Sequence, residues 1–439
     1  MAVIIPFRGV RYNTQKAGEM TALITPPYDV INEEEQKLFY EKSPYNVIRL
    51  EYGESRNNDS SEDNRYTRAA GFFQQWLQEE ILLHEHQPAL YLYEQEFNMA
   101  GKRLTRSGLI AGVGLEEYET GNILPHEETL PLAKADRLQL LRHCQANFSP
   151  IFSFYDDPAQ IVEKLTAPYK AHEPALAFRS DEGDFHRLWV IGEKQLITKL
   201  QDFFSGLKIY IADGHHRYET ALQFKREMNA QGSSKFDFCL MTLVNLHDPG
   251  LVIFPTHRLI RSLPLAEKTL LTQLAQIFTL NTVSFPRPQR QSVLEAELAK
   301  LAALASTHNA FLLYLGGEKL YQLTLGRSSQ PALAARYHHY TPAWCSLDVN
   351  VLNTLIFADL LGIDSTVRAR GDQLQYTRDA MEALTFVDNG TFQAAFFLNP
   401  TQLGEITAVA AAGEKMPQKS TYFYPKLITG LVINDFTVE

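Results

Sequence analysis

The pattern of apolar and polar residues predicts a strand that turns directly into a helix near the middle of the chain. Residues 207–212 alternate between apolar and polar side chains, which is the period of a half-buried strand. From Tyr218 onward, apolar side chains recur at positions 218, 221, 222 and 228, which fit one face of a helix. The intervening residues, Asp213–Arg217, are polar or glycine, so we expect a corner where the strand ends and the helix begins.

The same periodicities predict an α/β protein with mixed sheets. Residues 238–246 and 393–400 are almost continuously apolar, as buried strands are, and residues 89–114 and 309–325 fit hairpins. Amphipathic helices are predicted at 65–80, 265–278 and 290–304, and a short strand at 46–50. The order of these elements, with a change of composition after residue 262, favours three regions at 1–114, 115–262 and 263–439.

Composition narrows the classes of function. The chain has 439 residues, of which 45% are apolar and 21% charged, as in ordinary globular proteins with two or three domains. Its net charge of −10 argues against a general nucleic-acid binder, because such proteins gain affinity through clusters of Lys and Arg. No apolar run has the length of a membrane span and the first residues do not resemble a signal peptide, so we expect a cytoplasmic protein with no membrane partner.

Several well-known sites are excluded by their missing motifs. The three cysteines are far apart and form no CxxC pair, which favours three separate buried thiols over a disulfide or zinc site. The chain has neither GxxxxGK[ST] nor a GxGxxG that opens a helix, so the P-loop and the dinucleotide fingerprint are both absent.

The corner at 213–217 has the chemistry of an anion site. The first N–H groups of a helix point toward a ligand with the positive end of the helix dipole behind them. A glycine permits close approach of the backbone, an arginine can bind phosphate oxygens with two N–H groups, and histidines add donors. Asp213 fits if it holds Mg²⁺ or orients a histidine; the alternative is a plain turn in which it caps the helix. The candidate phosphate- and nucleotide-binding residues here are Gly214, His215, His216, Arg217 and Thr220.

A second stretch supplies an acid and two cations. His126 and Glu127 lie on a loop bounded by prolines, and Lys134 and Arg137 follow at the predicted start of a helix. Phosphoryl transfer to a hydroxyl needs a base near the nucleophile and positive charge around the moving phosphate. The alternative is a surface loop followed by a capped helix.

Four other residues are candidate ligand contacts. Asp29 follows a Pro-Pro pair on a predicted loop, and His257 with Arg258 offers a second anion contact or a surface turn. Lys419 lies in a segment, 413–426, where three lysines alternate with aromatic residues; it can cover an anionic ligand or form a solvated loop.

With these motifs together, the chain resembles the uncharacterised DUF1015 family over nearly its whole length. The segments that carry the resemblance are Pro6–Gly9, Pro26–Val30, His126–Thr129, Asp136–Arg137, Asn147–Pro150, Asp213–Tyr218, Pro255–Arg258 and Met416–Phe423. The Asp-Gly-His-His-Arg box at 213–217 is similar to that of the ParB/sulfiredoxin-like free serine kinases, which phosphorylate L-serine from ATP or ADP.

The resemblance implies a ParB/sulfiredoxin-like nucleotide-binding core at 115–262 with N-terminal and C-terminal α/β additions. Carried over by position, it makes Glu127 the base and the 213–217 corner the phosphate and metal site; Asp29 is the reserve base. Sulfiredoxin has a cysteine where this chain has His215, so sulfinic-acid reduction is not expected. ParB proteins carry a Gly-Glu-Arg-Arg box and a helix-turn-helix DNA domain, and neither is found here.

These observations predict a kinase for a small hydroxyl metabolite, with free serine as the leading acceptor and Mg²⁺ with ATP or ADP as cofactor. Glu127, His126 and Asp213 are the predicted catalytic residues, and Asp213 the metal ligand. Two other classes fit the same residues: a non-catalytic nucleotide-binding switch of the ParB type and a metal-dependent phosphohydrolase. The expected partners are the nucleotide and a small substrate, with no nucleic acid, and the many aromatic segments are compatible with a homodimer.

Overall fold

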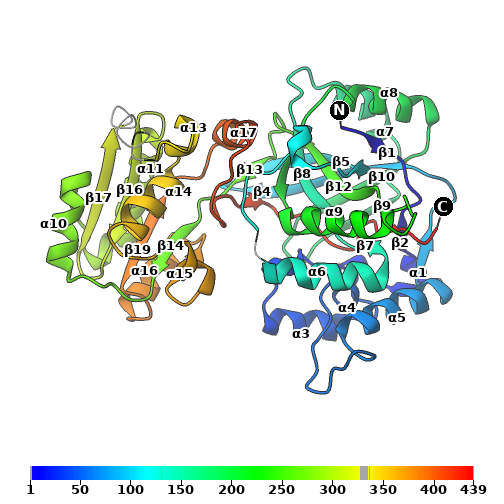
Figure 1. Ribbon diagram of the computed structural model, residues 1–439, viewed down its shortest axis with the longest axis horizontal. Helices are drawn as coiled ribbons and strands as arrows, with labels where there is room; N and C mark the ends of the chain where they lie inside the picture. Colours follow the sequence, from blue (N-terminus) through cyan, green and yellow to red (C-terminus); the bar gives the residue numbers. More distant parts are fainter. Residues whose placement is uncertain (1, 130, 327–334, 336, 439) are drawn as a thin grey trace. The chain divides into compact units, whose positions relative to one another are not determined.

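The computed structural model describes residues 2–129, 131–326, 335 and 337–438. Contacts divide the chain into two units, each described here by itself (Figure 1). The first unit comprises Met1–Pro125, Thr129–Val252 and Pro425–Glu439, and the second comprises His126–Glu128 and Ile253–Tyr424. The chain therefore leaves the first unit twice and returns to it for its last residues.

The first unit is built on a nine-stranded mixed sheet. Its strand order is β6-β11-β8-β12-β5-β4-β10-β9, and β1 pairs with β5. The pairs β11–β6 and β12–β8 are parallel and the others antiparallel, which confirms the predicted mixed α/β class. The strands are β1 (Ile4–Ile5), β4 (Leu90–Met99), β5 (Lys102–Gly114), β6 (Ile123–Leu124), β8 (Ile151–Tyr155), β9 (Leu176–Arg179), β10 (Phe185–Ile191), β11 (Ile209–Asp213) and β12 (Phe238–Asn245).

Helices cover the face of this sheet that carries the apolar core. Leu109 of β5, Met241 of β12 and Tyr218 of α9 belong to one buried cluster, and α6 packs on α9 while α5 packs on α6 (Figure 1). Because every second side chain of a strand points to the same face, the alternating residues of β5 reach this core together. The helices are α1 (Thr14–Ala17), α2 (Met20–Leu23), α3 (Glu33–Lys42), α4 (Ile48–Glu51), α5 (Arg65–Gln78), α6 (Pro131–Cys144), α7 (Ile161–Lys170), α8 (Lys194–Phe204) and α9 (His215–Asn229).

The last residues of the chain are tied into the first unit by short pairings. β21 (Asn434–Asp435) pairs with β7 (Ala146–Asn147), and Ile433 and Thr429 bridge residues near the N-terminus. A further small sheet joins β2 (Val10–Tyr12) to β3 (Leu82–His84). The start and the end of the sequence thus fold into the same unit.

The second unit has a six-stranded antiparallel sheet in the order β15-β17-β16-β19-β14-β18. Its strands are β14 (His257–Ile260), β15 (Thr279–Ser284), β16 (His308–Tyr314), β17 (Lys319–Gly326), β18 (Leu374–Thr377) and β19 (Ala394–Leu398), and β13 (Val252–Ile253) pairs with β20 (Phe423–Tyr424). Its helices are α10 (Glu267–Ile277), α11 (Arg290–Leu304), α13 (Pro342–Cys345), α14 (Asp348–Val351), the π-helix η5 (Leu352–Ala358), α15 (Ser365–Arg370), α16 (Ala380–Asp388) and α17 (Leu403–Ala411).

Some predicted elements are confirmed and one is wrong. The hairpins predicted at 89–114 and 309–325 are the antiparallel pairs β4–β5 and β16–β17. The strand predicted at 46–50 is instead the helix α4, because a short apolar run does not distinguish a buried strand from a buried helix. All three cysteines are buried free thiols, as predicted. Among the described residues, no helix combines the length and apolarity needed to cross a membrane.

The structure groups the residues differently from the predicted regions 1–114, 115–262 and 263–439. Gly108–Gly114 of β5, from the expected N-terminal region, pair with β12 of the expected core, so these two regions share one sheet. Residues 425–439 of the expected C-terminal domain belong to the first unit. Long-range strand pairing decides these borders, and local sequence carries little information about it.

Candidate functional site

The predicted corner exists and lies in the first unit. β11 ends at Asp213, and α9 begins at His215, three residues earlier than the periodicity indicated. Gly214 between them has φ 96° and ψ 26°, a left-handed conformation that costs other residues energy because of their Cβ atom. The glycine therefore allows the chain to turn directly from strand to helix.

The side chain of Arg217 folds back over Gly214. An ideal Cβ placed on Gly214 would lie 2.9 Å from Nη2 and 3.0 Å from both Cζ and Nε of Arg217, so the missing side chain makes room for the guanidinium. Nη1 donates to the Ser149 Oγ at 3.0 Å and to the Pro150 carbonyl at 2.6 Å. The Nε atom is buried. Among the described residues, neither Nε nor Nη2 has a hydrogen-bond partner. One edge of this guanidinium is therefore anchored, and its role as a phosphate contact stays a prediction.

Lys426 brings a second cation to the corner. Its ammonium forms an ion pair with the Asp213 carboxylate, with 2.5 Å between Nζ and Oδ2, and both side chains are mostly buried. This lysine is the second residue after the end of the second unit at Tyr424, and it belongs to the first unit. Sequence reasoning noted the lysines of the 413–426 segment but selected Lys419, because nothing local distinguishes one from the other.

The corner does not fit the predicted Mg²⁺ site. Asp213 already has a cationic partner in Lys426, whose ammonium lies where a metal would bind the same oxygen. In the part of the chain that the structure describes, no group of three or more His, Cys, Asp or Glu side chains is arranged to hold a metal ion. Magnesium is usually held by one or two carboxylates together with substrate phosphates and waters, so the described residues form no all-protein metal site, and a metal at Asp213 would compete with Lys426.

Arg137 is part of a buried ion network next to this corner. It donates to the Glu51 carbonyl at 2.8 Å and to the Asp136 carboxylate, it lies 3.3 Å from the Glu51 carboxylate, and its guanidinium lies 3.9 Å from the centre of the Tyr28 ring. Burial would lower the pKa of Arg137, but Glu51 and Asp136 outweigh it and raise the pKa. These contacts do not favour the predicted role of Arg137 as a contact of the transferring phosphoryl group.

Asp136 is held as an anion by the same network. Burial raises the pKa of its carboxyl, but Arg137, Tyr66 and Arg65 together outweigh that effect and keep the pKa below its ordinary value. The Tyr66 hydroxyl donates to Asp136 at 2.6 Å, and Arg65 forms an ion pair with it. The Asp136–Arg137 pair thus joins α5, α6 and the end of α4.

Two other predicted nucleotide-binding residues link helices. Lys134 of α6 forms an ion pair with Glu219 of α9, with 2.9 Å between Nζ and Oε2. Thr129 donates to the same carboxylate at 2.6 Å, and the buried Thr220 donates to the Lys134 carbonyl at 3.4 Å. These contacts hold α6 against α9. They do not support the predicted nucleotide-binding roles of Lys134 and Thr220.

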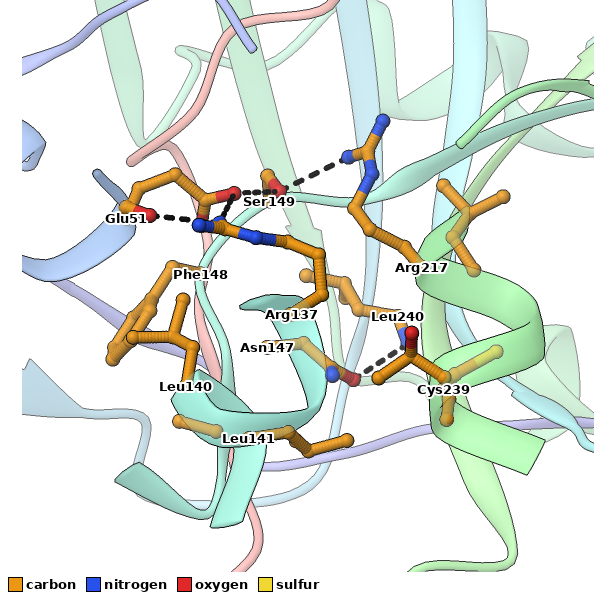
Figure 2. Close-up of a pocket in the computed structure, with 14 residues that line it drawn as sticks. Glu51, Arg137, Leu140, Leu141, Asn147, Phe148, Ser149, Arg217, Cys239 and Leu240 are labelled. Carbon is orange, nitrogen blue, oxygen red and sulfur yellow. Dashed lines mark hydrogen bonds and ion pairs between the residues drawn. The ribbon is translucent and has the colours of Figure 1, made fainter. Parts of the chain in front are cut away.

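A small cavity of about 50 Å³ lies between Arg137 and Arg217 (Figure 2). Apolar residues such as Leu140, Leu141 and Leu240 form much of its lining. This volume holds a few water molecules. The cavity is therefore too small to enclose a nucleotide.

Of the other predicted site residues, Asp29 lies in the first unit and the rest lie in the second, where His126 is buried. Its Nε2 lies 3.0 Å from the Thr421 hydroxyl, and its backbone carbonyl accepts from Met416 at 2.7 Å. Glu127 forms a β-bridge with Met416, so this short segment pairs with the predicted motif at 416–423. Glu127 and the Arg217 corner thus belong to different units, and their pairing in one site stays a prediction.

His257 and Arg258 serve the interior of the second unit. Burial, with the charge of Arg258, lowers the pKa of His257 to about 4, and its Nδ1 accepts a hydrogen bond from the Leu398 N–H at 3.4 Å. Arg258 is buried and donates to the Lys419 carbonyl at 3.0 Å; burial lowers its pKa to about 10. The Lys419 backbone is therefore held by Arg258, and its exposed side chain remains a candidate ligand contact.

A family model described as "Protein of unknown function (DUF1015)" matches residues 4–350. The chain belongs to the DUF1015 family. This confirms the family-level resemblance of the sequence. A comparison with curated proteins finds no match.

Solved structures with a distant likeness include proteins with and without a known activity. A conserved hypothetical protein from Pyrococcus furiosus is 14% identical, with a TM-score of 0.33, over 74% of this chain and 95% of that one. A free serine kinase in complex with AMP is 12% identical, with a TM-score of 0.35, over 74% of this chain and 92% of that one. A variant of a free serine kinase in complex with ADP has the same values.

Proposed function

We propose that this chain is a nucleotide-dependent phosphotransferase that transfers a phosphoryl group from ATP or ADP to a small hydroxyl compound, with free serine as the leading acceptor. The observation that carries the proposal is the Arg217 guanidinium, which is anchored through Nη1 and finds no hydrogen-bond partner for Nε and Nη2 among the described residues. Nε and Nη2 form the edge of arginine that binds two oxygens of one phosphate at once.

Further positive charge supports a phosphate at this corner. α9 starts at His215 directly beside Gly214, and a helix start favours anions. Asp213 holds the Lys426 ammonium at the same corner. Arginine, lysine and the helix start would stabilise the charge on the phosphates during transfer, which is the main task of a phosphotransferase. Magnesium enters the proposal only as the counterion that a nucleotide carries in solution.

Two carboxylates are candidates for the base that removes the acceptor proton. Glu127, assisted by His126, is the residue that the sequence resemblance implies, and it lies in the second unit. Asp29 is exposed and lies in the same unit as Arg217. The ring of its neighbour Tyr28 lies 3.9 Å from the guanidinium of Arg137, which lines the same cavity as Arg217. The two carboxylates are best tested by separate isosteric substitutions.

The deciding experiment is ³¹P NMR of the purified chain with ATP or ADP and Mg²⁺, with and without L-serine. We expect a phosphomonoester signal only when serine is present. Glu127→Gln should abolish that signal and leave ADP affinity unchanged, with Glu128→Gln as the control at the exposed neighbour. If Glu127→Gln retains full turnover and Asp29→Asn loses it, Asp29 is the base.

The phosphate role of Arg217 is tested by binding. Arg217→Ala should weaken ADP binding by about 10- to 150-fold, which corresponds to a charged hydrogen-bond contribution of roughly 1.5–3 kcal/mol. Arg226→Ala is the control, because it removes an exposed arginine from the same helix. Unchanged affinity in Arg217→Ala would refute the proposed corner. Tight binding without any phosphate transfer would instead indicate a nucleotide-binding switch, and release of phosphate without phosphoserine would indicate a hydrolase.

A further inference from the structure

A buried carboxylate outside the predicted site contacts the group that anchors Arg217. Glu51 is the last residue of α4 and is 3% exposed. Its Oε1 accepts a hydrogen bond from the Ser149 hydroxyl at 2.9 Å and forms an ion pair with Arg137. Figure 2 shows Ser149 between Glu51 on one side and the Arg217 guanidinium on the other.

The Ser149 hydroxyl has one proton, and its two neighbours determine where that proton points. A carboxylate can only accept and a guanidinium can only donate. The proton therefore points to Glu51, and the lone pairs of Oγ face the Nη1 of Arg217, 3.0 Å away. By accepting the hydroxyl proton, Glu51 leaves the lone pairs of Ser149 Oγ free to accept from Arg217.

The second anchor of Arg217 follows directly in the sequence. The Pro150 carbonyl accepts from the same Nη1 at 2.6 Å, so Ser149 and Pro150 use both N–H bonds of that nitrogen. A guanidinium is planar, so holding Nη1 sets the direction of the opposite edge, Nε and Nη2. The direction of the ligand-binding edge therefore depends on Ser149.

We infer that Glu51 is a positioning residue that, through the Ser149 hydroxyl, orients Arg217 toward the phosphates of the nucleotide. The inference rests on the proposed function for the identity of the ligand, and on the geometry of the three residues for the orientation. It gives a task to a buried acid that no motif in the sequence pointed to. It also gives the Asn147–Pro150 segment a role, because Ser149 and Pro150 hold the Nη1 of Arg217.

The test uses Ser149→Ala in the full-length chain, because this change breaks the link and leaves the Glu51–Arg137 ion pair in place. Ser153→Ala is the matched control: it removes another buried hydroxyl of the same unit, one that donates to Met241. We expect Ser149→Ala to weaken ADP binding, measured by calorimetry, by about 3- to 10-fold, as for the loss of one hydrogen bond. Ser153→Ala should bind ADP like the wild-type chain.

A double-mutant cycle separates positioning from general damage. If Ser149 acts through Arg217, Ser149→Ala should have no further effect on ADP affinity in an Arg217→Ala background. Glu51→Gln should weaken binding to a similar extent, because an amide can donate to Ser149 and turn its proton toward Arg217. An equal loss of affinity in both backgrounds, or full affinity in Ser149→Ala, would overturn the inference.

A crystal structure of Ser149→Ala tests the orientation without any ligand. A displaced Arg217 guanidinium supports the inference, and an unchanged one overturns it. This result is independent of the function: if the wild-type chain binds neither ADP nor ATP nor pyrophosphate, the proposed function fails, and the crystal structure still decides whether Ser149 positions Arg217.

Discussion

Replacing Gly214 with alanine should affect stability and ligand binding for two separate reasons. Gly214 has φ 96°, a region that costs an L-residue about 1–2 kcal/mol. The added Cβ would also lie 2.9–3.0 Å from three atoms of the Arg217 guanidinium. Because those atoms are the end of a flexible side chain, the guanidinium can move away, so the clash should change the site more than the stability.

We therefore expect Gly214→Ala to lower the free energy of unfolding by about 1–2 kcal/mol. For a unit of this size, that corresponds to a fall in melting temperature of roughly 2–8 °C. The displaced guanidinium should weaken ADP binding about tenfold or more, approaching the effect of Arg217→Ala. Calorimetry of ADP binding and thermal unfolding of the same samples measure the two effects.

Gly232→Ala is the control that separates them. Gly232 follows α9 and has φ 83°, but no atom lies within 4 Å of its added Cβ. It should lose a similar amount of stability and bind ADP like the wild-type chain. The reasoning is refuted if Gly214→Ala binds ADP with wild-type affinity, or if Gly232→Ala weakens binding as much as Gly214→Ala does.

Two further predictions concern Lys426 and one buried histidine, His186. Lys426→Gln should weaken ADP binding about tenfold, because it removes a cation from the corner. The control is Lys194→Gln, which changes an exposed lysine at the start of α8 and should leave ADP binding unchanged. If both variants bind ADP equally well, Lys426 is not part of the site. Burial and then Arg106 lower the pKa of His186 to about 3, so the folded state keeps it neutral while the unfolded state binds a proton below about pH 6.5. Above about pH 6.5 His186 is neutral in both states, so it does not lower the free energy of unfolding. As the pH falls from about 6.5 toward 3, the unfolded state gains a proton that the folded state does not bind, and the free energy of unfolding falls. In His186→Phe, the free energy of unfolding measured in urea should therefore fall less between pH 7.5 and pH 5 than it does in the wild-type chain. An equal fall in both proteins would contradict the lowered pKa of His186 in the folded state.

The candidate site was predictable from the sequence only where its residues are neighbours in the chain. The Asp213–Arg217 corner follows from a change of hydrophobic period around a glycine, and the structure contains it with the strand, the left-handed glycine and the helix. Lys426 and Glu51 were missed. Lys426 is one of three lysines in a segment without regular periodicity, and Glu51 ends an apolar run that was predicted as a strand and is the helix α4.

Ser149 shows the same limit from another side. It belongs to a segment that carries the family resemblance, so the sequence marked it as a member of a motif, but its contact with Arg217 joins positions that are 68 residues apart. Conversely, Arg137, Lys134 and Thr220 have the residue types expected at a phosphate site, yet the fold uses their polar groups between helices. Residue type states what a side chain can do, and its partners decide what it does.

The sequence by itself determined the class of the protein, its two predicted hairpins and the local geometry of the corner, because hydrophobic period and glycine conformation act over a few residues. Only the tertiary structure decided that residues 425–439 return to the first unit and that β5 and β12 share a sheet. It also paired Asp213 with Lys426 and assigned Glu127 to the second unit. These outcomes depend on contacts between distant parts of the chain, whose free energy comes from burial and pairing that local patterns do not encode.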